Sequence, residues 1–78
     1  VFDCPYGVGI LSDGKIVVSE RGRNCLSVFN RDGTFCYRIG EGGLKHPGHI
    51  FIDSFDNILV TDWEVDGIRV FNPHGEMI

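Results

Sequence analysis

Two histidines stand close enough in this sequence to suggest metal binding. His46 and His49 flank Pro47 and Gly48. A zinc site needs further nitrogen, sulfur or carboxylate ligands, and no cysteine or carboxylate at close spacing completes such a set here. A solvated loop explains this segment better. We therefore predict no metal site and no cofactor in this chain.

An acidic stretch is the second candidate for chemistry. It comprises Asp53, Asp56, Asp62, Glu64 and Asp66. Its aspartates fall at the ends of expected turns and loops, where aspartate is favoured because its carboxylate bonds to nearby backbone N–H groups. No Ser/His/Asp or Cys/His arrangement falls within one reachable cluster. We therefore predict no catalytic residue in this chain.

Arginine and tryptophan side chains occur in two loops that occupy corresponding positions. Residues 20–24 contain two arginines, and residues 62–66 contain the single tryptophan. An arginine beside an aromatic ring suits an interface hot spot and also suits stacking on a nucleic-acid base. The alternative is that the arginines are solvated and the tryptophan packs internally. The partner-binding rim that we predict comprises Arg21, Arg23, Asn24, Lys45 and Trp63.

Charge favours a protein over a nucleic acid as the partner of this rim. The chain has a formal net charge of −4, whereas phosphate binding requires clustered Lys and Arg. Residues 20–24 carry two arginines and one carboxylate, a sum of +1, and residues 62–66 carry three carboxylates, a sum of −3. The second loop would repel phosphate. We therefore predict a protein partner, with RNA as the alternative.

An internal repeat defines the elements that position these loops. Shifting the chain by 42 residues places Pro5 on Pro47, and residues 28–30 on residues 70–72, which read Val-Phe-Asn in both copies. This period is close to the length of one four-stranded propeller blade, about 40–50 residues. The chain has 11 glycines, and their spacing together with the β-branched runs excludes helical repeats. The sequence predicts an all-β fold.

Each repeat contains short apolar runs separated by turn residues. The strands that we predict cover residues 7–11, 15–19, 25–29 and 34–39 in the first copy, and 50–52, 58–61 and 68–71 in the second. Met77 and Ile78 align with Phe35 and Cys36, so the outer strand of the second copy is truncated. The expected division is a preceding link at 1–4, a blade at 5–40, an inter-blade loop at 41–46 and an incomplete blade at 47–78.

The predicted core consists of apolar residues in the central strands of the two blades. Its members are Ile16, Val18, Leu26, Val28, Phe29, Ile58, Val60, Ile68, Val70 and Phe71. In a closed propeller each blade is covered on both faces by its neighbours. Two blades therefore leave one face of each uncovered, and we expect that further blades are needed to close the fold.

These repeats resemble the NHL repeat, whose pattern opens with Pro-x-Gly-apolar and continues with Gly-Asn-Ile-apolar-Val-small-Asp. The first copy reads Pro-Tyr-Gly-Val and Gly-Lys-Ile-Val-Val-Ser-Glu, and the second reads Pro-Gly-His-Ile and Asp-Asn-Ile-Leu-Val-Thr-Asp. The family's later Asn-Arg-Ile-x-Val-Phe segment is also present, with Cys25 and Gly67 in place of its arginine. Glu20 stands where aspartate is usual. The missing arginines argue against functions that need a basic face.

The resemblance implies a β-propeller similar to the C-terminal domain of TRIM-NHL proteins. In such proteins an upstream RING domain provides ubiquitin-ligase activity, and the propeller recruits a substrate protein or binds RNA. The resemblance therefore implies that this segment is a non-catalytic binding module and that any ligase activity of the whole protein lies outside it. A metal-dependent propeller enzyme of the lyase or hydrolase type is the second alternative.

The cysteines and the hydropathy indicate where the protein resides. Cys4, Cys25 and Cys36 are odd in number and form no Cys-x-x-Cys motif, which argues against a disulfide framework and favours a reducing compartment. No apolar run approaches the ~18 residues of a membrane-spanning helix. We expect a cytoplasmic protein.

Overall fold

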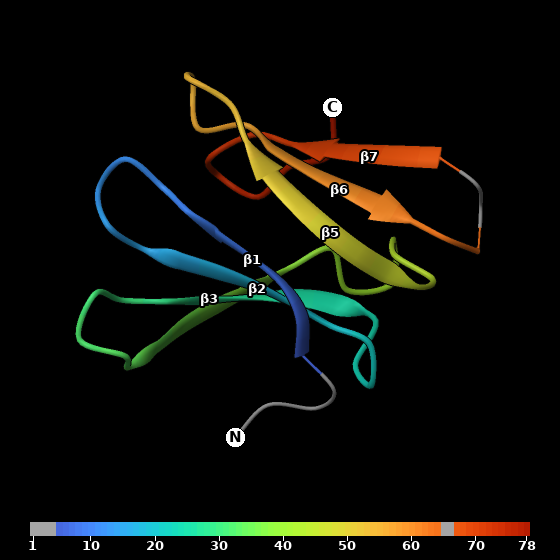
Figure 1. Ribbon diagram of the computed structural model, residues 1–78, viewed down its shortest axis with the longest axis horizontal. Coiled ribbons are helices and arrows are strands. Elements are labelled where there is room, and N and C mark those ends of the chain that lie inside the picture. Colours follow the sequence, from blue (N-terminus) through green and yellow to red (C-terminus); the bar gives the residue numbers. More distant parts are fainter. Residues whose placement is uncertain (1–4, 65–66) are drawn as a thin grey trace.

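The computed structural model describes residues 5–64 and 67–78, which form two antiparallel sheets (Figure 1). The first sheet, in the order β1-β2-β3-β4, consists of β1 (Pro5–Ile10), β2 (Ile16–Glu20), β3 (Cys25–Phe29) and β4 (Phe35–Ile39). The second, in the order β5-β6-β7, consists of β5 (Pro47–Ile52), β6 (Ile58–Asp62) and β7 (Gly67–Phe71). This arrangement confirms the predicted all-β fold of two propeller blades. The described residues contain no helix long and apolar enough to span a membrane.

The two sheets have the same register, as the sequence repeat requires. In the first sheet Ile16 pairs with Phe29, and in the second Ile58 pairs with Phe71. The outer strand β4 begins where Phe35 pairs with Phe29. The corresponding position in the second sheet is an isolated bridge between Phe71 and Met77. The second blade therefore starts its fourth strand at the place that the repeat predicts.

Glycines with positive φ close the equivalent turns of the two blades. Gly33 has a φ of 91°, and its N–H donates to the carbonyl of Asn30 at 2.9 Å. Gly75 has a φ of 89° and donates to the carbonyl of Asn72 at the same distance. Residues with a Cβ rarely adopt this backbone conformation. The turns thus follow directly from the Asn-x-x-Gly spacing of the sequence.

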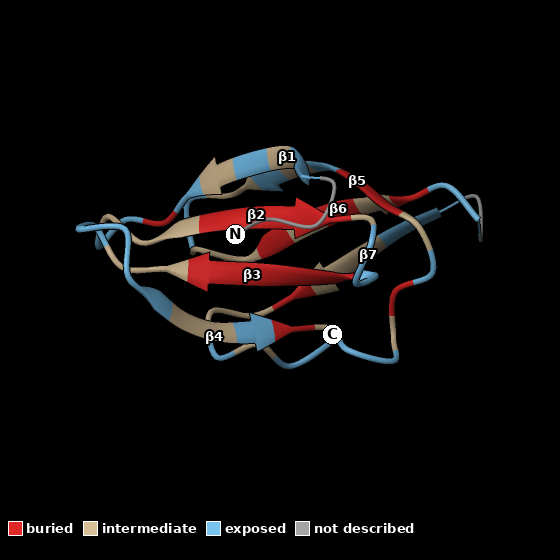
Figure 2. Ribbon diagram, turned by 90° about the horizontal axis from the view of Figure 1, so that it is seen from below, coloured by how far each residue is buried: buried red, intermediate tan, exposed pale blue. Residues whose placement is uncertain are grey.

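The core lies between the two sheets, which stack face to face (Figures 1 and 2). The central strands supply most of it, because their side chains face the opposite sheet. Leu44, from the segment that links the sheets, closes one side. The remaining buried residues of this core are Leu11, Val17, Leu26, Val28, Ile39, Ile58, Val60 and Phe71.

The predicted core is correct for the side that faces the opposite sheet and wrong for the outer side of β7. Ile68 retains 61% of its surface exposed. Ile16, Phe29 and Val70 are only partly buried. Val17, which was not predicted, is fully buried. The reason is that Ile68 and Val70 lie on the face of the second sheet that has no cover among the described residues, as expected for two blades.

Substituting Val60 with alanine tests the position of the core. Val60 is fully buried on β6, so loss of its two methyl groups removes transfer energy and leaves a cavity. We expect the free energy of unfolding to fall by about 2 kcal/mol, measured by urea denaturation. Val8→Ala is the matched control, because Val8 is 63% exposed on β1. Equal effects of the two substitutions would contradict this placement of β6.

Some sequence predictions fall outside the residues that the structure describes. These are the link at residues 1–4, the thiol of Cys4 and the carboxylate of Asp66. The division at residues 5–40, 41–46 and 47–78 stays a prediction. Among the described cysteines, Cys25 is buried and Cys36 is partly buried, and both are free thiols. Burial raises the pKa of the Cys25 thiol above its ordinary value.

Candidate partner-binding site

Arg21 contacts two aromatic rings at the junction of the two sheets. It lies in the loop after β2, and its guanidinium carbon is 4.4 Å from the ring centroid of Tyr6 and 4.5 Å from that of Trp63. The two rings meet edge to face, with centroids 5.2 Å apart. The guanidinium thus occupies the angle between them, where both rings attract its charge. Trp63 remains 48% exposed.

The two histidines flank this aromatic group. His46 stacks on Trp63 with ring centroids 5.5 Å apart and planes within 9°. The backbone N–H of Trp63 donates to the backbone carbonyl of His46 at 3.1 Å. His49 packs against Tyr6 with centroids 5.0 Å apart. Gly48 leaves room for the indole, because a Cβ there would lie 2.7 Å from the Trp63 Nε1. No three His, Cys, Asp or Glu side chains converge within the described residues.

Asp62 fixes the inter-blade segment beneath these rings. Its carboxylate is 1% exposed and accepts hydrogen bonds from the backbone N–H groups of Lys45 and His46, each at 3.0 Å. The N–H of Glu64 adds a third bond at 3.3 Å. Burial alone would raise the pKa of Asp62. The three hydrogen bonds and the charge of Arg69 lower the pKa by more than burial raises it, so the net shift is downward. Asp62 is therefore a charged structural residue.

Arg23 has a different environment from Arg21. Its guanidinium forms an ion pair with Glu20, which is almost fully buried and also accepts a hydrogen bond from the Ser27 hydroxyl. The Arg23 side chain keeps 38% of its surface exposed. The charge of Arg23 is thus largely compensated. Arg21, in contrast, forms no ion pair with a carboxylate among the described residues.

Asn24 joins the first sheet to the inter-blade segment. It has a positive φ of 53°, a conformation that asparagine tolerates better than most residues. In the orientation that satisfies both of its polar atoms, its amide nitrogen donates to the carbonyls of Arg21 at 2.8 Å and Lys45 at 2.9 Å. The side chain of Lys45 is exposed nearby.

Contacts in the structure join four of the five predicted rim residues, whereas Arg23 pairs with Glu20. Arg21 meets Trp63 through ring contact, Asn24 meets Lys45 through a hydrogen bond, and Arg23 lies in the same loop. That these residues bind a partner stays a prediction. The sequence did not indicate that Tyr6, His46 and His49 belong to the same surface. We call these eight residues the rim cluster: Tyr6, Arg21, Arg23, Asn24, Lys45, His46, His49 and Trp63.

The acidity of the second loop is smaller at the surface than the sequence indicated. Of its three carboxylates, Asp62 is buried and bound by backbone N–H groups, and Asp66 lies outside the described residues. Glu64 is exposed. The charge count of −3 therefore overstates the repulsion that an anionic partner would meet at the rim cluster.

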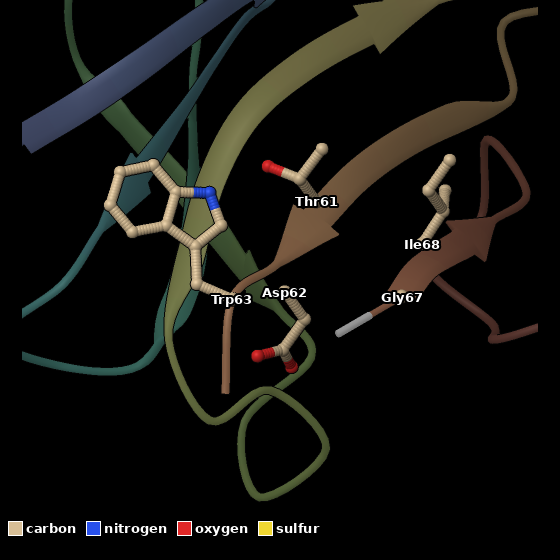
Figure 3. A pocket seen from close by; sticks show the side chains of 5 residues that line it. All are labelled: Thr61, Asp62, Trp63, Gly67 and Ile68. Carbon is tan, nitrogen blue, oxygen red and sulfur yellow. The ribbon is translucent and has the colours of Figure 1, made fainter. Parts of the chain in front are cut away.

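A shallow pocket opens beside the rim cluster, at the end of β6 and the beginning of β7. Its lining residues are Thr61, Asp62, Trp63, Gly67 and Ile68. Figure 3 shows the Trp63 side chain on one side of this pocket and Ile68 on the other. Trp63 thus contacts Arg21 and also borders the pocket. A partner that covers the indole would reach both places.

Residues 2–29 match the family model of the NHL repeat. The two sheets are NHL-type blades. The chain is 26% identical over 70 residues to Protein brain tumor of Drosophila melanogaster. The aligned segment covers 88% of this chain and 7% of that protein. It is 30% identical over 66 residues to B-box type zinc finger protein ncl-1 of Caenorhabditis elegans. This second aligned segment covers 83% of this chain and 8% of that relative. The NHL blades resemble those of TRIM-NHL proteins, and the chain spans less than a tenth of these relatives' length.

Proposed function

We propose that this pair of NHL blades is a non-catalytic binding module whose rim cluster recruits a protein partner. The observation that carries the proposal is the placement of Arg21 between Tyr6 and Trp63, without a carboxylate partner among the described residues. A guanidinium held in this way has lost side-chain freedom before binding, which lowers the entropic cost of the complex.

The composition of the rim cluster supports a protein partner. Tryptophan, tyrosine and arginine dominate the binding energy of protein interfaces, because they bring large areas with few rotatable bonds. Trp63 and Tyr6 are both partly exposed, and Arg21 lies against them. The likeness to TRIM-NHL proteins supports a wider role in recruiting substrate to a RING-type ubiquitin ligase in the cytoplasm. Ligase chemistry would lie in other domains.

RNA is the second candidate, and the burial of Asp62 favours it more than the sequence did. With that carboxylate turned into the protein, the exposed indole and the guanidinium form a surface on which a base could stack. The net charge of −4 still argues for a protein.

Selection on two libraries tests the proposal. The immobilised chain is offered a displayed random-peptide library and a randomised single-stranded RNA pool, and the enriched ligands are titrated against Arg21→Ala/Arg23→Ala. We expect enriched peptides whose binding weakens about tenfold or more and whose salt dependence changes little. If RNA is enriched, losing the phosphate-facing charge of Arg21 should flatten the salt dependence by about one unit of slope, because Arg23 is already paired with Glu20.

Arg21→Lys is the matched control, because lysine keeps the charge but not the planar guanidinium. Relative to the double alanine variant, Arg21→Lys should regain little of the peptide affinity. Its RNA binding should regain most of the salt dependence of the unmodified chain. Circular dichroism checks that each variant is folded. Enrichment of neither ligand, or unchanged affinity in the double variant, would contradict the proposal.

A further inference from the structure

Arg21 is held in place without using its hydrogen-bonding capacity. A guanidinium can donate a hydrogen bond from each of its nitrogens. Among the described residues the Arg21 side chain forms no ion pair, and its Nε is buried without a hydrogen-bond partner. Tyr6 and Trp63 hold the guanidinium through the attraction of their rings for its charge. The donors on its terminal nitrogens therefore remain for an acceptor from outside the described residues.

The group around Arg21 forms within the two sheets of this chain. Arg21 and Trp63 are 42 residues apart and occupy the same position in the two repeats. Tyr6 comes from β1 of the first sheet, and His46 comes from the segment that links the sheets. Trp63 contacts the rings of both. A ligand of Arg21 would thus be recognised by a surface that these two sheets already provide.

The charges that remain around Arg21 favour an anionic ligand. Arg23 is already paired with a carboxylate, and Asp62 is enclosed and bound by backbone N–H groups. Among the described residues of the two loops and the link, the charges left for a ligand are those of Arg21, Lys45 and Glu64. They leave a charge of +1 at this surface, whereas the whole chain has a formal net charge of −4.

A single carboxylate fits this charge better than a nucleic acid does. One guanidinium suffices for one carboxylate, which it binds through parallel N–H···O hydrogen bonds. A nucleic-acid strand would instead bring several phosphates against two cations and one carboxylate, and its affinity depends on how many phosphates are neutralised. The surface therefore favours the acidic side chain of a protein.

We infer that the rim cluster recognises an acidic residue of its protein partner, whose side-chain carboxylate binds the Arg21 guanidinium between Tyr6 and Trp63. This inference rests on the proposed function, because it names the chemical class of the partner at the same site. Tyr6 and Trp63 are 42% and 48% exposed, so a partner that reaches Arg21 also lies across their rings. It then excludes water from the ion pair, which strengthens the pair.

The peptides enriched by selection on the unmodified chain provide the test. They are synthesised with acetylated and amidated ends, so that every carboxylate belongs to a side chain. Each aspartate is replaced in turn by asparagine and each glutamate by glutamine, which keeps the shape and removes the charge. We expect one such replacement to weaken binding about tenfold or more, measured by isothermal titration, as the loss of an enclosed charge-assisted hydrogen bond predicts.

A double-mutant cycle connects this carboxylate to Arg21. Arg21→Met keeps an aliphatic stem against the rings but has no donors, so the same replacement in the peptide should change its affinity less than about twofold. Arg31→Ala is the matched control. Arg31 is exposed in the turn after β3, whereas the loop with Arg21 lies at the other end of that strand, where Glu20 pairs with Cys25. With Arg31→Ala the replacement should still weaken binding about tenfold.

The outcomes separate this inference from the proposed function. Circular dichroism checks folding, and Arg21→Gln takes the place of Arg21→Met should the latter not fold. Enriched peptides that need Trp63 but withstand the replacement of every carboxylate would overturn the inference and leave the proposed function standing. A tenfold loss that persists in the Arg21 variant would do the same. Enrichment of RNA alone, or of neither ligand, would overturn both.

Discussion

Replacing Asp62 with alanine is expected to lower the free energy of unfolding by about 3 kcal/mol, which exceeds the effect expected for a buried valine. The carboxylate accepts the N–H groups of Lys45, His46 and Glu64 while almost fully buried. Alanine would leave these donors without a partner in a place that water reaches poorly. Urea denaturation at neutral pH measures the effect.

An exposed aspartate is the control for this prediction. Asp13 also forms hydrogen bonds, with Lys15, but its side chain is 53% exposed, so water replaces the lost partner. Asp13→Ala should therefore lower the stability far less than Asp62→Ala, because exposed ion pairs generally contribute little. If both alanine variants lose the same stability, Asp62 does not hold the inter-blade segment as described.

The pH dependence provides a second measurement on Asp62. Its pKa in the folded state lies below the ordinary value of 3.8. The stability that it contributes is therefore fully present above that value and is lost as the pH falls through the lower, folded-state pKa. Asp62→Asn should flatten this acid-side loss, because asparagine does not titrate. An unchanged acid profile in Asp62→Asn would show that other carboxylates cause the loss.

The strands were predictable from sequence because the 42-residue repeat contains each strand pattern in two aligned copies. β3 was predicted with its observed ends, and the other strands differ from the prediction by one to three residues at an end. The bulge near Pro47 explains the largest difference, since β5 begins before the regular alternation of its apolar residues. Burial was less predictable. Ile68 has the same pattern as Leu26, but only Leu26 has a sheet packed on its side.

The candidate site was partly predictable for a similar reason. Equivalent loops lie at the same end of adjacent blades, so Arg21 and Trp63 were expected on one rim. The contact of Tyr6 with both depends on how the second sheet packs on the first, which no pattern within one repeat encodes. The replacement of Tyr6 by Gly48 in the second copy was the available signal, because it marks unequal space at equivalent places.

The charge count overstated the exposed acidity of the second loop because it treated every carboxylate of that loop as facing solvent. Asp62 ends β6, and its side chain turns toward the N–H groups of the inter-blade segment. Glu20 occupies the same place in the first blade, where its longer side chain reaches Ser27 and Arg23. The departure from aspartate to glutamate thus coincides with a change of partners. Position within the repeat, more than residue type, decides which charges a partner meets.

Truncating Trp63 to alanine is expected to weaken binding of the selected peptide by about 2 kcal/mol, or roughly 30-fold. Two effects contribute. The indole is the largest exposed ring of the rim cluster, so its loss removes contact area. It is also one of the two rings that hold Arg21, so its loss frees the guanidinium, which must then be ordered on binding. Isothermal titration of the peptide measures the change.

Three comparisons separate an anchor from a residue that only supports the fold. Trp63→Phe keeps a ring beside Arg21 and should recover a large part of the lost affinity. Phe55→Ala removes a ring that is more exposed than Trp63, at a turn away from the rim cluster, and should leave the affinity unchanged. Urea denaturation of Trp63→Ala shows whether stability has fallen. If the folded Trp63→Ala variant binds the peptide as tightly as the unmodified chain, the rim cluster is not the binding surface, and Trp63 serves to pack the two blades together.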